Sequence, residues 1–206
     1  MKVGIIGGTG SFGRALAVRL REAGFEVVIG SRDAARAEET ARELGVTGAT
    51  NENAVRDVDL AVLAVKADAA LASAEELRHA LGETPLLSVA AELAFSKSGV
   101  RPTPEARSLA ERIAERVSAP VVAGLHSLAA SNLGAEEPPE EDALVCGDDP
   151  RAKELALDLA ARLVTGRAVD AGPLASARTL EGMTAVIVNV NRRYKAHAGV
   201  RLTGLP

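Results

Sequence analysis

Three glycines near the start of the chain have the spacing of a dinucleotide-binding loop. They stand as G-x-G-x-x-G between a mostly apolar run, residues 3–6, and a segment with helical periodicity, residues 11–22. In this fingerprint the glycines allow a tight turn, a close backbone approach to pyrophosphate and close packing of helix on strand. A second apolar run, residues 27–29, follows at the distance that a βαβ unit requires, so the match is more specific than the spacing alone. The candidate contacts with the dinucleotide are Gly8, Thr9, Gly10, Ser11, Phe12 and Gly13.

The end of the second apolar run indicates which dinucleotide binds. Sites for NAD usually carry Asp or Glu there, about 20 residues past the glycines, whereas a nearby Arg accommodates the additional phosphate of NADP. This chain has Ser31 and Arg32 at that point, and Arg36 follows one helical turn later. A hydroxyl and two guanidinium groups suit a dianionic phosphate, although two arginines on a solvated helix face are the alternative interpretation. Asp33 fits the N-cap or first turn of the next helix, so the segment predicts NADP.

Few proton donors follow the later predicted strands. In open α/β sheets ligands bind outside the carboxyl ends of the strands, where this chain has Lys66, Ala90 and the pair His126-Ser127. Only Lys66 and His126 are obvious donors, and His126 is either a catalytic group or a buried residue with structural hydrogen bonds. A carbonyl reductase must supply a proton as well as a hydride. Transfer between two redox cofactors mainly requires that the reacting carbons be held about 3 to 3.5 Å apart.

Strands and helices alternate along residues 1–124, which predicts a parallel sheet. We expect an α/β fold with a Rossmann-type, doubly wound, mostly parallel sheet and a small C-terminal α/β annex closed by one long helix. Residues 1–124 would form the NADP-binding domain, and residues 125–206 the annex that completes a second-ligand pocket. Residues 51–57 read as a polar turn, Thr103-Pro104 as the start of a helix, and residues 135–142, acidic with two prolines, as a solvated loop.

Composition restricts the function further. The 206 residues are 47% hydrophobic and 25% charged with a net charge of −4, which is ordinary for a globular protein and gives no reason to expect nucleic acid or an anionic membrane as a partner. The single cysteine, Cys146, allows no internal disulfide or zinc cluster and fits a core position. No apolar run approaches about 18 residues, and no leader precedes the first strand. We therefore expect an unprocessed cytoplasmic protein without a metal site.

Several further segments resemble one family, the NADPH-dependent reductases of coenzyme F420, a deazaflavin. The resemblance extends over essentially the whole chain, and the combination of its segments is more specific than the glycine loop alone. The matching segments are Gly7-Gly8-Thr9-Gly10, Ser31-Arg32, residues 124–130, residues 145–149, Asp170-Ala171-Gly172-Pro173-Leu174 and residues 189–195. Lys66-Ala67 and Ala90-Ala91 depart from the pattern of the archaeal members, which have prolines in these loops.

This resemblance implies reversible hydride transfer between NADPH and F420 with no obligate acid or base, and a homodimer formed through the long C-terminal helix. It implies that Thr9, Ser31, Arg32 and Arg36 hold the 2′-phosphate of NADP. The deazaflavin pocket would be lined by residues 126–130, and both rings would be flanked by the two departing loops. The candidate cofactor contacts therefore also include Lys66, Ala90, His126, Ser127 and Leu128. The alternatives are an NADP-dependent imine or hydroxy-acid reductase and a non-enzymatic NADPH-sensing regulator.

Overall fold

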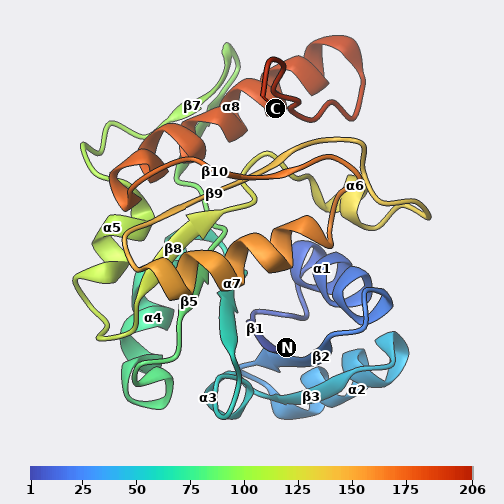
Figure 1. Cartoon of the computed structure of the whole chain (residues 1–206), viewed down its shortest axis with the longest axis vertical. Coiled ribbons are helices and arrows are strands. Elements are labelled where there is room, and N and C mark those ends of the chain that lie inside the picture. Colours follow the sequence, from blue (N-terminus) through green and yellow to red (C-terminus); the bar gives the residue numbers. More distant parts are fainter. Residues whose placement is uncertain (206) are drawn as a thin grey trace.

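One eight-stranded sheet forms the centre of the molecule. The computed structural model describes residues 1–205, and its strands lie in the order β10-β9-β8-β5-β4-β1-β2-β3 (Figure 1). A separate antiparallel hairpin, β6–β7, lies outside this sheet. The strands are β1 Lys2–Ile6, β2 Glu26–Ser31, β3 Thr47–Thr50, β4 Leu60–Leu63, β5 Leu86–Ser88, β6 Leu93–Ser96, β7 Gly99–Pro102, β8 Val121–Gly124, β9 Ala143–Gly147 and β10 Ala168–Asp170.

The sheet is parallel except at one boundary. All neighbouring strands from β8 to β3 pair in parallel, β9 pairs antiparallel to β8, and β10 returns to a parallel pairing with β9. The chain runs from β1 outward to β3 and then crosses back to β4 on the other side of β1, which creates a switch in strand order. Ligands of open α/β sheets bind at such a switch, at the carboxyl ends of the strands. The predicted fold class is therefore confirmed, and the C-terminal strands extend the same sheet.

Helices cover both faces of the sheet. They are α1 Ser11–Glu22, α2 Ala34–Leu44, α3 Asn51–Ala54, α4 Ala67–Leu81, α5 Leu109–Ala114, α6 Ala130–Leu133, α7 Pro150–Ala161, a 3-10 turn Leu174–Ser176 and α8 Ala177–Tyr194. Helices α1, α2 and α7 contribute to one buried cluster, and α4, α5 and α8 to the other. Successive strand residues point to opposite faces, so Ile5 belongs to the first cluster and Ile6 to the second. This double burial explains why the strands are continuously apolar.

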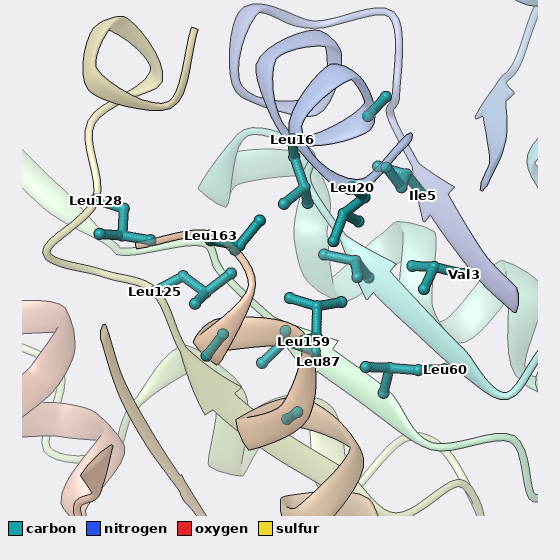
Figure 2. Packing of buried hydrophobic residues seen from close by; sticks show 14 of the residues in the cluster. Val3, Ile5, Leu16, Leu20, Leu60, Leu87, Leu125, Leu128, Leu159 and Leu163 are labelled. Atoms are coloured by element: carbon teal, nitrogen blue, oxygen red, sulfur yellow. The ribbon is translucent and has the colours of Figure 1, made fainter. Parts of the chain in front are cut away.

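The first cluster packs directly beneath the glycine loop. Figure 2 shows Leu16 and Leu20 of α1 pointing toward Ile5 of β1 and toward Leu159 of α7, and these side chains are fully buried. Leu125, which follows β8, lies in the same cluster. The glycine loop and the segment after β8 are therefore both flanked by side chains of the same buried cluster.

Four local predictions need correction, the first being the solvated loop expected over residues 135–142, whose last two residues, Glu141 and Asp142, are buried. The polar turn expected over residues 51–57 contains the short helix α3, capped by Thr50, and an unpredicted strand, β3, precedes it. Helix α5 does not begin at Thr103-Pro104. It begins at Leu109, because Ser108 and Glu111 form a capping box that satisfies free amides at the helix start.

The helix cap predicted from the sequence at Asp33 is present. Asp33 is the N-cap of α2 and Gly45 ends that helix with a left-handed φ of 67°. Among the residues that the structure describes, no helix has both the length and the apolar character needed to span a membrane.

Candidate dinucleotide site and adjoining pocket

The glycine loop is attached to the ends of β1 and β2 by backbone hydrogen bonds. The Gly8 amide donates to the carbonyl oxygens of Gly30 at 3.0 Å and Ile5 at 3.2 Å, and the Gly10 amide donates to the Gly7 carbonyl at 3.0 Å. Gly7 has a φ of +77°, a left-handed conformation that residues with a side chain rarely adopt. The sharp turn out of β1 therefore requires glycine at its first position.

Two of the fingerprint glycines are required by packing and one faces open space. A Cβ on Gly8 would lie 2.6 Å from Ile29 Cβ, and a Cβ on Gly13 would lie 2.7 Å from Gly8 Cα. A Cβ on Gly10 would meet only the Gly7 carbonyl oxygen, at 3.3 Å. The inner glycines thus let the loop, β2 and α1 approach one another, while Gly10 leaves the outer side of the loop clear for a ligand.

The first turn of α1 is available to an anion. Its N-cap, Gly10, offers no side-chain cap, and the turn contains no acidic residue. The free amides and the helix dipole at such a terminus favour a negatively charged group. The loop and the helix therefore have the arrangement expected of a pyrophosphate cradle.

The end of β2 presents one buried hydroxyl and two exposed cations. Ser31 is 9% exposed, and its Oγ accepts from the Asp33 amide at 3.2 Å. The Asp33 carboxylate accepts from the Arg36 amide at 3.2 Å, so it is engaged with the helix backbone. The side chains of Arg32 and Arg36 are exposed, and within residues 1–205 neither has an ion-pair partner. Both guanidinium groups are free to meet a phosphate.

A pocket of about 230 Å³ opens beside the loop at the switch in strand order. Its volume is below the usual range for small-molecule pockets, which begins at about 300 Å³. Its walls come from the segments that follow β4, β5 and β8, together with one side chain each from α1, β6 and α8. The lining residues are Phe12, Ala64, Val65, Val89, Ala91, Leu93, Leu125, His126, Leu128 and Thr184.

His126 is the titratable residue in this lining, and it is neutral. Burial lowers the pKa of His126 to about 4, opposed in part by a hydrogen bond to the Ala90 carbonyl. His126 Nε2 lies 3.3 Å from that carbonyl oxygen, which can only accept, so Nε2 carries the proton. Nδ1 is buried without a partner among the described residues. The geometry favours the structural interpretation of His126 over the catalytic one and leaves one acceptor nitrogen unsatisfied beside the pocket.

Of the other predicted residues, some lie at the pocket and others lie outside its lining. Ala90 holds His126, and Leu128 lines the pocket. Ser127 is 3% exposed and its hydroxyl donates to the Asp142 carbonyl at 3.3 Å, so it is outside the lining. Lys66 is exposed at the N-cap position of α4 and is also outside the lining.

Sequence reasoning missed residues that distant segments bring to the site. The Thr184 hydroxyl donates to the His126 carbonyl at 2.9 Å, which connects α8 to the segment after β8, and Leu93 enters the lining from the hairpin. Asn51 accepts from the Gly7 amide at 3.3 Å. Nothing in the local sequence around Thr184 or around Asn51 pointed to the site.

Known proteins share this fold and sequence. The family model described as NADP oxidoreductase coenzyme F420-dependent matches residues 2–92. Two relatives named F420-dependent NADP reductase, from Methanothermobacter thermautotrophicus and Methanothermobacter marburgensis, are each 34% identical over 100% of this chain, which covers 96% and 100% of their lengths. A solved structure from Arthrobacter sp. FB24 has a TM-score of 0.87 at 24% identity and covers 99% of this chain and 100% of its own.

Proposed function

This chain belongs to the family of F420-dependent NADP reductases, and we propose that it catalyses reversible hydride transfer between NADPH and coenzyme F420. The two relatives match this chain over 96% and 100% of their own lengths, so the similarity extends well beyond residues 2–92, which the family model matches. NADP and F420 are its redox partners.

The composition of the pocket carries the proposal. His126 is the one titratable residue in the lining, and its low pKa keeps it neutral at pH 7. Its Nε2 proton is already directed at the Ala90 carbonyl. A carbonyl or imine reductase needs a proton donor at this point, whereas a reaction between two redox rings does not, because the reduced ring can take its proton from water.

The dinucleotide half of the site fits NADP. We assign the pyrophosphate to the glycine loop and the first turn of α1, where Gly10 leaves the backbone open and acidic side chains are absent from the turn. We assign the 2′-phosphate to Ser31, Arg32 and Arg36, with Thr9 in the adjoining loop. Arg can bind a phosphate with paired hydrogen-bond donors. An Asp or Glu at the same place, as in NAD sites, would repel the phosphate.

We assign the pocket half of the site to the reacting rings. Bound NADPH supplies a hydride from C4 of its nicotinamide, and F420 accepts it at C5 of its deazaflavin. The aliphatic side chains of Val65, Val89 and Leu125 offer apolar surfaces against which the rings can pack. The unpartnered Nδ1 of His126 can accept from a ligand N–H or O–H group, and Thr184 fixes the backbone carbonyl of the same residue.

The proposal is tested by mixing the purified protein with NADPH and F420 and following the visible absorbance of oxidised deazaflavin. We expect bleaching that requires both compounds. Tight NADPH binding without bleaching would refute the proposal and favour a sensing regulator. NADPH consumption with a cyclic imine or a keto acid, in the absence of F420, would instead favour the reductase alternative.

We also propose that two copies associate through the exposed face of α8. Val186, Val190 and Tyr194 are 61%, 36% and 73% exposed and recur every four residues, so they form one apolar stripe along the helix. Phe95 of the hairpin, 64% exposed, adds to this exposed apolar surface. A second copy can cover the same stripe on both partners, as a two-fold interface requires. Light scattering should give the mass of a dimer for the natural chain and of a monomer for Val186→Lys; a monomeric natural chain refutes the interface.

The proposed compartment is the cytoplasm. Cys146 is a buried free thiol, and burial raises its pKa to about 12, as expected for a core residue. A single unpaired cysteine is usual in a reducing compartment. Recovery of the protein outside the cytoplasmic fraction of its source cells would contradict this assignment.

A further inference from the structure

The first residue of the glycine loop is attached to helix α3 through one side chain. Gly7 leaves β1 with a φ of +77°, and its amide donates to Asn51 Oδ1 at 3.3 Å. Asn51 is the first residue of α3, a short helix that follows β3. A loop amide that turns away from the sheet needs such a partner, because an unpaired amide in a partly buried position is costly.

Helix α3 reaches the loop because two glycines make room for it. A Cβ on Gly30 would lie 2.7 Å from Asn51 Oδ1, and a Cβ on Gly4 would lie 2.0 Å from the Ala54 carbonyl oxygen. Asn51 therefore occupies the space where a side chain of β2 would otherwise lie. The Gly30 carbonyl also accepts from the Gly8 amide at 3.0 Å. Gly30 thus contacts the loop through its backbone and makes room for the Asn51 side chain, which supports the loop.

The same segment adjoins the candidate phosphate site. Thr50 pairs with Ser31 across the β2–β3 ladder, and its hydroxyl accepts from the Asn53 amide at 3.2 Å as the cap of α3. Asn51 follows directly, so its backbone is fixed by strand pairing on one side and by the cap on the other. It connects the end of β2 with the loop at the end of β1.

We propose that Asn51 is a positioning residue that holds the glycine loop against β2 in the geometry that binds the dinucleotide pyrophosphate. This inference rests on the proposed function of the loop as a dinucleotide site. Asn51 acts through the Gly7 backbone and touches no reacting atom, so its loss changes binding more than turnover. NADPH and NADH share the pyrophosphate, so loss of Asn51 should weaken the binding of both alike. Removal of a 2′-phosphate contact should instead weaken the binding of NADPH alone.

The test compares Asn51→Ala with Asn53→Ala, which removes an exposed asparagine two residues away in the same helix. Dissociation constants are measured from the fluorescence of bound NADPH and NADH, which requires neither F420 nor turnover. Loss of one supporting hydrogen bond is expected to raise both constants about 3- to 10-fold in Asn51→Ala and to leave them unchanged in Asn53→Ala. At saturating NADPH the kcat should change less than about twofold, as expected for lost ground-state binding.

Two further variants separate positioning from general damage. Asn51→Asp keeps an acceptor oxygen at the same reach and should retain the protection of the loop amides against hydrogen exchange. Asn51→Leu is similar in shape but has no acceptor, so it should lose this protection. Unchanged binding of both dinucleotides in Asn51→Ala would overturn the proposal. A loss confined to NADPH, or an equal fall in kcat, would also overturn it. Because binding is measured directly, these results remain informative even if F420 is not the acceptor.

Discussion

Replacement of Glu181 with glutamine should stabilise the protein at alkaline pH and have much less effect at acid pH. Glu181 is fully buried on α8, where its Oε1 accepts from the Ala110 amide at the start of α5 at 3.2 Å. Its Oε2 is buried without a hydrogen-bond partner in the described part of the chain. The nearest opposite charge, Arg178 Nη1, lies 3.9 Å from that oxygen. An ionised carboxylate is therefore poorly compensated in this place.

The size of the effect follows from the pKa of this carboxyl. Burial raises the pKa of Glu181 from the usual 4.5 to about 7, a rise that hydrogen bonds from α5 amides and the charge of Arg178 oppose and the charge of Glu92 supports. Between these two values the folded protein retains a proton that the unfolded chain has lost, so stability falls as the pH rises from 4.5 toward 7. At about 1.36 kcal/mol per pH unit the full loss is about 3 kcal/mol, and most of it falls between pH 5 and pH 8.

Urea unfolding of the natural chain and of Glu181→Gln at pH 5 and pH 8 measures this difference. Glutamine resembles the protonated acid and does not titrate, so the stability of Glu181→Gln relative to the natural chain should increase by about 2 to 3 kcal/mol between the two pH values. Other titrating groups, including His126, are common to both proteins and cancel. Glu39→Gln, which changes an exposed carboxyl of α2, should show almost no pH-dependent difference. A constant difference between Glu181→Gln and the natural chain would refute the reasoning, since it would mean that the buried carboxyl ionises normally.

Two further predictions concern the dinucleotide site. Arg32→Ala should weaken NADPH binding about 10-fold, the lower end for an exposed charged hydrogen bond, and leave NADH binding nearly unchanged; Arg42→Ala, in the last turn of α2, should change neither. Equal losses for NADPH and NADH would exclude a phosphate contact by Arg32. Gly13→Ala should cost about 1 to 3 kcal/mol of stability, because the new methyl group meets backbone atoms. Gly10→Ala should keep stability within about 0.5 kcal/mol yet weaken NADPH binding. Thermal unfolding measures the stability of each variant, and titration with NADPH measures its affinity. Unchanged NADPH binding in both variants would argue against the cradle.

The β1–α1–β2 unit was predictable because its determinants are local. The glycine spacing, the apolar stripe of α1 and the cap at Asp33 all lie within residues 1–36, and each acts on its near neighbours. Double burial of the strands also leaves a direct signal, a continuous apolar run, as over residues 60–63. These features sufficed to predict β1, α1 and β2 and the glycine loop that joins β1 to α1.

The elements that were missed have their determinants elsewhere in the chain. Strand β3, Thr-Gly-Ala-Thr, has no large apolar residue because α2 approaches closely; a Cβ on Gly48 would lie 2.6 Å from the Ala37 carbonyl oxygen. The contact of Asn51 with Gly7 depends on how α3 docks and is not encoded in either neighbourhood. The hairpin could have been found, since Leu93 and Phe95 alternate with small residues before a turn that ends at Gly99 with a φ of 134°.

The reaction depends on properties that local sequence patterns cannot express. A glycine loop identifies a dinucleotide, but the chemistry at its nicotinamide end is set by which side chains meet after folding. His126 in isolation is a plausible acid, and only burial against Ala90 lowers its pKa to about 4 and directs its proton away from the pocket. Because the Nε2 proton of His126 is engaged by Ala90 and aliphatic side chains form most of the remaining lining, the pocket can orient two rings but has no side chain placed to protonate a carbonyl or an imine among its described lining residues. A described pocket lining whose one titratable residue is neutral therefore favours ring-to-ring hydride transfer over reduction of a carbonyl or an imine.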